Sequence, residues 1–330
     1  MKSISLAIVG ATGVVGRKFL HVLSERKIPI HHLVLFASEK SAGQKIVYQN
    51  QEYQVLALNE ENIKKHPVDF ALFSAGAHVS KVFAPLFKSL NTIVIDNSSA
   101  YRMDPSVPLV VPEVNPKDAF DHDYIIANPN CSTIQAVVVL KPLHELYQLK
   151  RIVISTYQAV SGAGLQGLYD LNHQLVSGKT TKFPYQIYNN VIPQIDVFTE
   201  NGNTKEEEKM IHEMRKIMHL PSLKISATAV RVPVTNGHSE SINIEFEKSF
   251  SLVDIRYALE KTRGVKLIDD IQNNKYPMPI IADGTDDVYV GRIRKDESLE
   301  SGINCFVVAD NLRKGAATNA IQILELFLNV

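Results

Sequence analysis

The sequence predicts an α/β protein built from two domains, a doubly wound parallel sheet followed by an α+β domain. Its 330 residues favour two domains over one. In the first part of the chain, short apolar runs alternate with helical patterns, which is typical of parallel strands covered on both faces. After Cys131, longer segments alternate apolar and polar residues, as strands with one covered face do.

The first domain begins with a short β run rich in Ile, Leu and Val at 4–9. Apolar residues at helical spacing predict a helix over 13–25. Further apolar strands are predicted at 32–38, 69–76, 92–99 and 124–127. Such a doubly wound sheet binds ligands at the carboxyl ends of its strands.

The second domain contains five longer strands, which we expect to be antiparallel: 151–160, 223–234, 240–248, 288–294 and 304–310. The apolar stretch 314–330 predicts a terminal helix that returns to the first domain. We therefore expect residues 1–128 plus 312–330 in the first domain and 129–311 in the second. The Pro- and Tyr-rich segment 183–194 is interpreted as irregular, either a dimer arm or a loop over the site.

Composition excludes several classes of protein. Lys plus Arg and Asp plus Glu both number 35, so bulk charge indicates neither a nucleic-acid nor a membrane partner. No apolar run approaches the roughly 18 residues of a membrane span, and glycines interrupt the N-terminal apolar run too early for a signal peptide. Two cysteines make no disulfide framework, which indicates a cytoplasmic protein with unpaired thiols.

Three glycines, Gly10, Gly13 and Gly16, lie between the first strand and the first helix. Glycine permits a tight turn, close approach of a pyrophosphate and close packing of helix on strand, while the helix N-terminus attracts the anion. The spacing is G-x-x-G-x-x-G rather than G-x-G-x-x-G. The context predicts a Rossmann-type dinucleotide site; the alternative is a tight turn without a ligand.

The second strand ends in "FASEKSAG", which bears on the choice of dinucleotide. NAD sites usually place an acid here for the ribose 2′-hydroxyl, whereas a cation favours the 2′-phosphate of NADP. Ser38, Lys40 and Ser41 therefore favour NADP, with Glu39 an ambiguous neighbour. A polar loop at a strand end is the alternative for Lys40.

Cys131 follows Asn-Pro-Asn at the start of a predicted helix. A helix N-terminus lowers the pKa of a thiol, because its partial positive charge favours the thiolate nucleophile. The same N–H groups could hold a developing oxyanion, with the Asn130 side chain as a second donor. Cys305 provides a contrast, since it lies inside a strand and is interpreted as a buried apolar residue. The alternative for Cys131 is a small residue tolerated at a helix start.

The stretch "VRVPVTNGHSES" predicts a hairpin with His238 at its end, a position suited to a catalytic acid or base. The alternative is a solvated turn histidine. Arg231 shares strand parity with Ala227 and Ala229, so it points to an apolar face, where it needs an anion.

Residues 203–218 predict a helix with Thr204 and Glu207 as a capping box. Glu206 lies on the helical stripe of Met210 and Met214, which indicates that it points toward the interior. Lys209 is its i+3 neighbour, and a solvated salt-bridge face is the alternative for that lysine.

Six motifs in this order resemble the bacterial type of aspartate-β-semialdehyde dehydrogenase: "GATGVVG", "NPNCSTIQ", "YQAVSGAG", "EEEK", "RVPVTNGHSE" and "DNLRKGAATNAIQ". The resemblance runs from end to end. N-acetyl-γ-glutamyl-phosphate reductase has Asn-Pro-Gly-Cys-Tyr around its cysteine, and glyceraldehyde-3-phosphate dehydrogenase has Ser-Cys-Thr-Thr, so Asn-Pro-Asn-Cys-Ser favours the aspartate enzyme.

The resemblance implies a Rossmann-type NADP-binding domain and an α+β catalytic and dimerisation domain of the glyceraldehyde-3-phosphate dehydrogenase C-terminal type. It implies that Cys131 is the nucleophile, His238 the acid/base, and Gln158 the residue that orients the acyl group. Substrate binding is expected of Arg231 for the α-carboxylate, Glu206 for the α-ammonium, Arg102 and Lys209 for phosphate, and Asn130. The implied NADP site comprises Gly10, Thr12, Gly13, Val14, Val15, Ser38, Lys40, Ser41, Ser161, Gly162 and Asn311.

The implied reaction is the NADPH-dependent reductive dephosphorylation of L-aspartyl-4-phosphate to aspartate semialdehyde through a Cys131 thioester. It serves biosynthesis of the aspartate family of amino acids, and no metal is expected. A homodimer is expected from the resemblance. Two alternatives stay open: N-acetyl-γ-glutamyl-phosphate reduction, and a non-catalytic NADP-binding sensor.

Overall fold

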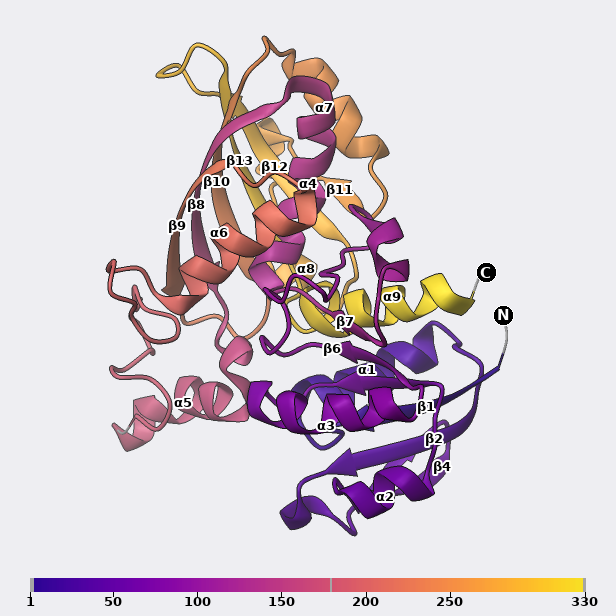
Figure 1. The fold of residues 1–330 in the computed structure, drawn as a ribbon. Helices are drawn as coiled ribbons and strands as arrows, with labels where there is room; N and C mark the ends of the chain where they lie inside the picture. The colour runs from indigo at the N-terminus through magenta and orange to yellow at the C-terminus, as the bar shows by residue number, and fades with distance from the viewer. Residues whose placement is uncertain (1–2, 179, 329–330) are drawn as a thin grey trace. The chain divides into compact units, whose positions relative to one another are not determined.

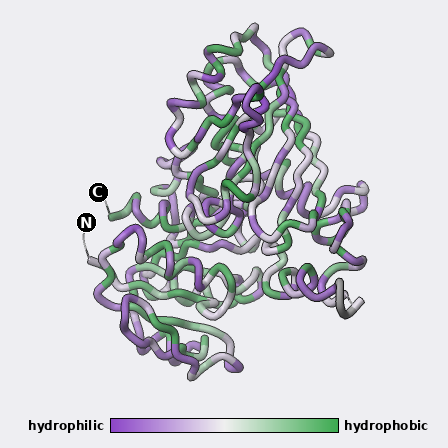
Figure 2. Tube along the Cα trace, turned by 180° about the vertical axis from the view of Figure 1, so that it is seen from behind, coloured by the Kyte–Doolittle hydropathy of each residue, from purple (hydrophilic) through white to green (hydrophobic). Residues whose placement is uncertain are grey.

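The computed structural model describes residues 3–178 and 180–328 as two compact units (Figure 1). One unit contains Met1–Pro129 and Ala316–Val330, and the other contains Asn130–Gly315. The last two residues of the predicted terminal helix, 329 and 330, lie outside the described part. Hydrophobic stretches follow the strands of both units, whereas hydrophilic stretches concentrate on the outer loops (Figure 2).

The first unit contains a sheet of seven strands in the order β3-β4-β2-β1-β5-β6-β7. All neighbouring pairs are parallel except β3 with β4. The strands are β1 Ile4–Val9, β2 Ile30–Ala37, β3 Lys45–Tyr48, β4 Gln51–Ala57, β5 Phe70–Phe73, β6 Ile93–Asp96 and β7 Ile125–Ala127. The predicted parallel core is confirmed, while the β3–β4 hairpin was not predicted.

Helices cover both faces of this sheet, which is why strands β1, β5, β6 and β7 are mostly apolar. The helices are α1 Val14–Glu25, α2 Glu60–Lys65, α3 Ala77–Ser89 and the terminal α9 Thr318–Leu328. Residues of α1 and α9 share one core with Leu6 and Ile8 of β1. On the other face, Phe87 of α3 makes edge-on ring contacts with Phe36 and Phe73.

The second unit contains a mixed sheet of six strands in the order β11-β12-β13-β10-β8-β9. Its strands are β8 Leu149–Gln158, β9 Lys224–Arg231, β10 His238–Phe246, β11 Val265–Leu267, β12 Val288–Lys295 and β13 Gly302–Ala309. The expectation of a wholly antiparallel sheet is wrong, because β8 pairs with β9, and β11 with β12, in parallel. The parallel pairing of β8 with β9 requires a long crossover connection, and the helices α5 Gly164–Ser177 and α6 Lys205–Met218 lie within it.

The predicted hairpin of Arg231 and His238 is also wrong. Strands β9 and β10 are consecutive in the chain but do not pair, because β8 lies between them. β9 is parallel to β8 and β10 is antiparallel to it. The carboxyl ends of β8 and β9 and the amino end of β10 therefore share one end of the sheet.

Helices of the second unit pack on one face of this sheet: α4 Cys131–Tyr147, α6 Lys205–Met218 and α7 Leu252–Lys261. The unit also contains α5 Gly164–Ser177 and the short α8 Pro279–Ala282. Segment 183–194 contains no helix or named strand. In the described part of the chain, no helix has the length and apolar character needed to cross a membrane.

Candidate active site

Cys131 is the first residue of α4, a helix of 17 residues with the apolar sequence expected of a buried element. Its side chain is partly exposed, and neither cysteine of the chain forms a disulfide. Cys305 lies in β13 and is 2 % exposed. Burial raises the pKa of the Cys305 thiol to about 12, so the predicted contrast between a helix-start cysteine and an inert strand cysteine is confirmed.

Asn130 caps this helix. Its Oδ1 accepts hydrogen bonds from the backbone N–H groups of Ser132 (3.0 Å) and Thr133 (3.3 Å). Its Nδ2 donates to Glu206 Oε1 at 2.7 Å, and its own backbone N–H donates to Glu213 Oε2 at 2.6 Å. These bonds differ from the expected oxyanion site, because both backbone donors and the side-chain amide already have protein acceptors.

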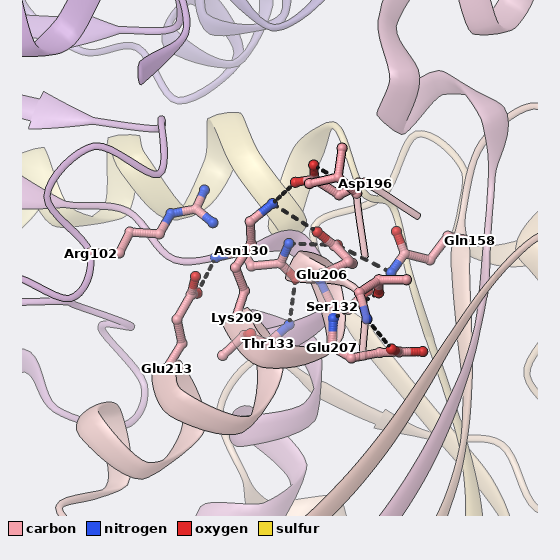
Figure 3. Close-up of polar contacts among 12 residues, drawn as sticks. Arg102, Asn130, Ser132, Thr133, Gln158, Asp196, Glu206, Glu207, Lys209 and Glu213 are labelled. Atoms are coloured by element: carbon pink, nitrogen blue, oxygen red, sulfur yellow. Dashed lines mark hydrogen bonds and ion pairs between the residues drawn. The ribbon is translucent and has the colours of Figure 1, made fainter. Parts of the chain in front are cut away.

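Glu206 accepts hydrogen bonds from the side chains of Asn130, Gln158 and Lys209, which lie on three elements of the second unit (Figure 3). It is 5 % exposed and lies on the stripe of Met210 and Met214, both fully buried, so the predicted inward direction is confirmed. The predicted capping box is also present: Thr204 Oγ1 accepts from the Glu207 N–H, and Glu207 Oε2 accepts from the Thr204 N–H at 2.6 Å. This cap fixes the first turn of α6, from which Glu206 projects.

Lys209 holds the second oxygen of Glu206. Its Nζ lies 3.2 Å from Glu206 Oε2 and 2.8 Å from Asp196 Oδ2, with a quarter of the side chain exposed. Burial lowers the pKa of Lys209, but the Glu206 and Asp196 carboxylates outweigh burial and raise it. The lysine is therefore a half-buried cation shared between two carboxylates rather than a solvated surface charge.

Arg231 ends β9 and is 5 % exposed. One guanidinium nitrogen, Nη1, donates to the Ala159 carbonyl at 2.6 Å. Burial lowers the pKa of Arg231, and the negative charges of Glu206 and of the Cys131 thiolate oppose that shift. The arginine thus lies within electrostatic range of both the acid of α6 and the sulfur of α4, which supplies the anions that its buried position requires.

His238 begins β10 and is completely buried, so the alternative of a solvated turn histidine is wrong. The Ala159 N–H donates to Nδ1 at 3.1 Å, which leaves the proton of the neutral ring on Nε2. Nε2 is buried and has no hydrogen-bond partner in the described structure. Burial and, secondly, the Arg231 charge hold the pKa of His238 well below its usual value. The ring can therefore donate a hydrogen bond from Nε2 to a substrate oxygen.

The side chains of Arg231 and His238 both lie beside Gly162. A Cβ at Gly162 would lie 3.2 Å from Arg231 Nη1 and 3.3 Å from His238 Nε2. Beside it, Asn311 Nδ2 donates to Ser161 Oγ at 2.9 Å, and Asn311 Oδ1 accepts from the Gly237 N–H. The predicted residues Ser161, Gly162 and Asn311 thus form one cluster of the second unit.

Gln158 ends β8, directly opposite Arg231 in the register of β8 and β9. It is 2 % exposed, and its Nε2 donates to Glu206 Oε1 at 3.3 Å. The residues Cys131, Gln158, Glu206, Arg231 and His238 therefore meet at one end of the sheet, on its helix-covered face.

Sequence reasoning missed three contributors to this site. Glu213, 1 % exposed, holds the Asn130 backbone; its helical stripe position with Met210 and Ile217 could have indicated that it is buried. Gly315 packs against Cys131, since a Cβ there would lie 2.9 Å from the cysteine Cβ. Phe183 places its ring 5.9 Å from the Arg231 guanidinium. The last contact shows that segment 183–194 starts beside the site.

In the first unit, Gly10 follows β1 with a φ of +88°, and a Cβ there would lie 2.5 Å from Ser74 O. A Cβ at Gly16 would lie 2.2 Å from Gly10 O, so only glycine allows α1 to pack this closely on the turn. Gly13 is the N-cap of α1 and provides no side-chain acceptor. The chain continues from β1 to β2 on one side and returns to β5 on the other, which is the topology of a dinucleotide crevice. The turn therefore fits a pyrophosphate.

Other predicted binding residues of the first unit surround strand ends. Thr12, Val14 and Val15 are partly exposed at the start of α1. Ser38 and Lys40 are exposed after β2, and Ser41 is partly exposed. Arg102 is 8 % exposed and donates to the carbonyls of Asn97 and Asn128, both at 2.9 Å. The Arg102 charge also acts on Asp96, since burial raises the pKa of that carboxyl and the arginine opposes the shift.

The described residues contain no group of three or more His, Cys, Asp or Glu side chains that could hold a metal ion.

Comparison with known proteins matches two family models along the chain. Residues 5–122 match the semialdehyde dehydrogenase NAD-binding domain, and residues 140–314 match the semialdehyde dehydrogenase dimerisation domain. The aspartate-semialdehyde dehydrogenase of Aquifex aeolicus is 57 % identical over 98 % of this chain and 97 % of its own length. These matches confirm the predicted pairing of a Rossmann-type domain with an α+β domain.

Two solved structures of the same family name superpose on this chain over nearly its full length. Aspartate semialdehyde dehydrogenase II of Vibrio cholerae, in complex with ASA, superposes with a TM-score of 0.95 at 43 % identity, covering 100 % of this chain and 99 % of that one. The Candida albicans enzyme, solved with NADP, superposes with a TM-score of 0.80 at 26 % identity over 99 % of both chains.

Proposed function

The chain belongs to the aspartate-semialdehyde dehydrogenase family, and we propose that Cys131 is the nucleophile with which it converts L-aspartyl-4-phosphate to aspartate semialdehyde. The observation that carries this assignment is the position of Arg231, which lies within electrostatic range of both Cys131 and Glu206 and beside His238. One end of the second sheet then carries the nucleophile Cys131 and the hydrogen-bond donor His238. It also carries Arg231 and Glu206, whose opposite charges suit the charged groups of an amino acid.

The helix N-terminus and the Arg231 charge both favour the thiolate form of Cys131. Its sulfur attacks the acyl carbon, the bond from carbon to the phosphate oxygen breaks, and inorganic phosphate leaves as a thioester forms. When bound, NADPH supplies the hydride that reduces this thioester. His238 donates a hydrogen bond from Nε2 to the substrate oxygen and stabilises the negative charge that hydride addition places on it. The carbon–sulfur bond then breaks as that oxyanion re-forms a carbonyl, the aldehyde leaves and the Cys131 thiolate is restored.

Substrate recognition follows from charge. We assign the α-carboxylate to Arg231 and the α-ammonium to Glu206, the buried cation and anion of the site. Asn130 and Gln158 both donate to Glu206 and so fix its orientation. Gln158 also orients the acyl group, and Lys209 and Arg102 provide positive charge for the phosphate.

We assign NADP(H) as the cofactor. Gly10, Thr12, Gly13, Val14 and Val15 form the turn for its pyrophosphate, and Ser38, Lys40 and Ser41 suit a 2′-phosphate because they offer hydroxyls and a cation after β2. Ser161, Gly162 and Asn311 complete the set. The NADP bound to the Candida albicans relative supports this choice.

We further propose a homodimer in the cytoplasm. The family model of residues 140–314 describes a dimerisation domain. The face of the second sheet opposite the helices exposes Tyr157, whose ring contacts Phe306. The irregular segment 183–194 also exposes two apolar side chains, Tyr185 and Val191. A second copy would cover such apolar surface. The absence of a bond between Cys131 and Cys305 suits a reducing compartment.

The assay that tests this function runs the reaction in reverse. NADP reduction should require both aspartate semialdehyde and phosphate, and should be slow with N-acetylglutamate semialdehyde. Cys131→Ala should abolish it, whereas Cys305→Ala, the matched thiol control, should keep most of it. Near-normal turnover of Cys131→Ala would falsify the covalent mechanism, and preference for the N-acetylated aldehyde would reassign the substrate.

A further inference from the structure

A second buried acid lies beside the site and has no role in the mechanism above. Glu240 is 0 % exposed and lies two residues after His238 on β10. Alternation along the strand places it on the same face as His238 and Ile242, the face covered by α4. Both carboxyl oxygens are buried, and neither has a hydrogen-bond partner in the described structure.

Its neighbour is Gln135, which lies one helical turn after Cys131 on α4 and is also 0 % exposed. Gln135 Nε2 donates to the backbone carbonyl of His238 at 3.3 Å. This bond connects the helix of the nucleophile with the strand of the histidine. The other end of the amide, Oε1, is buried and has no partner in the described structure.

The unpartnered atoms of the two side chains have a common explanation. Gln135 is the polar neighbour of the Glu240 carboxyl group. Burial raises the pKa of Glu240 well above its usual value and outweighs the Gln135 amide, which lowers that pKa. An ionised carboxylate offers only acceptors, so it cannot satisfy the carbonyl oxygen of an amide. A neutral carboxylic acid has an O–H donor and carries no buried charge.

We propose that Glu240 is a positioning residue that remains a neutral acid, donates its proton to Gln135 Oε1 and so keeps the Gln135 amide directed at the His238 carbonyl. Through this chain of side chains, Glu240 sets the spacing between Cys131 and His238. The proposal depends on the roles given to these two residues in the proposed function. Displacement of a catalytic group by about 1 Å can cost a hundredfold in rate, so a support of this kind affects turnover.

Two substitutions separate the neutral hydrogen bond from mere filling of space. Glu240→Gln is uncharged and can still donate to Gln135 Oε1, so its kcat should stay within about threefold of the parent. Glu240→Leu fills the space without a donor, so its kcat should fall about tenfold or more, while KM changes little. Ser241→Ala, on the opposite face of the same strand, is the matched control. Equal kcat values for the Gln and Leu variants would overturn the proposal.

Infrared spectroscopy provides a readout that a purely structural role would not give. At pH 8, the difference spectrum between the parent and Glu240→Gln should contain the carbonyl stretch of one neutral carboxylic acid. A carboxylate band in its place would overturn the proposal, whatever the kinetics show. Since the spectrum needs no substrate, it stands even if Cys131→Ala is active and the proposed function fails.

Discussion

Asn130 donates a 2.7 Å hydrogen bond from Nδ2 to Glu206 Oε1 while its Oδ1 caps the helix that begins at Cys131. One amide thus connects the start of α4 with the buried acid of α6. Any change in charge at this position acts on both.

Asn130→Asp tests this connection. Aspartate caps a helix as well as asparagine does, but it would place a second carboxylate against Glu206 and next to the Cys131 thiol. We expect slower alkylation of Cys131 and a loss of about 1–3 kcal/mol in the free energy of unfolding, measured by iodoacetamide kinetics and urea denaturation. Asn59→Asp, at the cap of α2, is the control and should change stability by less than about 0.5 kcal/mol. Unchanged alkylation in Asn130→Asp would contradict the connection.

Arg231→Leu should raise KM for aspartate semialdehyde by about tenfold or more, because a charged hydrogen bond of about 1.5–3 kcal/mol is lost. Arg231→Lys keeps the charge but not the planar fork, so it should recover only part of the loss. Steady-state kinetics measure both, with Arg151→Leu on the exposed part of β8 as the control. An unchanged KM in Arg231→Leu would remove the arginine from carboxylate recognition.

Gly315→Ala should disturb Cys131 directly, because the new Cβ would lie 2.9 Å from the cysteine Cβ. Such a contact forces a local shift, which costs about 1–3 kcal/mol in stability. We expect a fall of about tenfold or more in kcat and in the alkylation rate of Cys131. A circular dichroism spectrum like that of the parent would show that the fold is kept, and normal alkylation in that folded variant would speak against the close contact.

His238 predicts a specific pH dependence of stability. Its pKa in the folded protein is held well below the usual value by burial and by Arg231. Below about pH 6.5 the unfolded chain binds a proton that the folded protein does not. The free energy of unfolding should therefore decrease as the pH falls below about 6.5, by at most about 1.4 kcal/mol per pH unit from this group.

Urea denaturation between pH 5 and 8 measures this effect. The slope should be smaller in His238→Gln than in the parent, whereas His32→Gln, at an exposed position, should keep the parent slope. Parallel curves for His238→Gln and the parent would mean that the histidine is not held neutral by the fold.

Local patterns in the sequence predicted much of the fold and of the site. The strand, glycine turn and helix over residues 4–25 follow from apolar periodicity and from the conformational needs of Gly10 and Gly16. The inward direction of Glu206 follows from its stripe on α6. Each of these depends on residues close together in the chain.

Strand pairing in the second sheet could not be predicted in the same way. The Asn-Gly turn between Arg231 and His238 is a strong local hairpin signal, yet β8 lies between the two strands. That insertion is decided by contacts between segments about 70 to 100 residues apart in the chain, which a local pattern does not contain. Gly315 was missed for the same reason, because its closeness to Cys131 is a tertiary contact.

The placement of β8 between β9 and β10 has a consequence for tolerance to insertion. Gln158, Arg231 and His238 lie at the ends of three adjacent strands, so their lateral separation is set by the spacing of hydrogen-bonded strands, about 4.8 Å. The length of the loops that join these strands does not enter that spacing. Residues added beside the exposed Gly178, at the end of α5, or at the turn before Gly202 should therefore leave the geometry of the three side chains intact, so loops of different length can be grafted there while the chemistry stays the same.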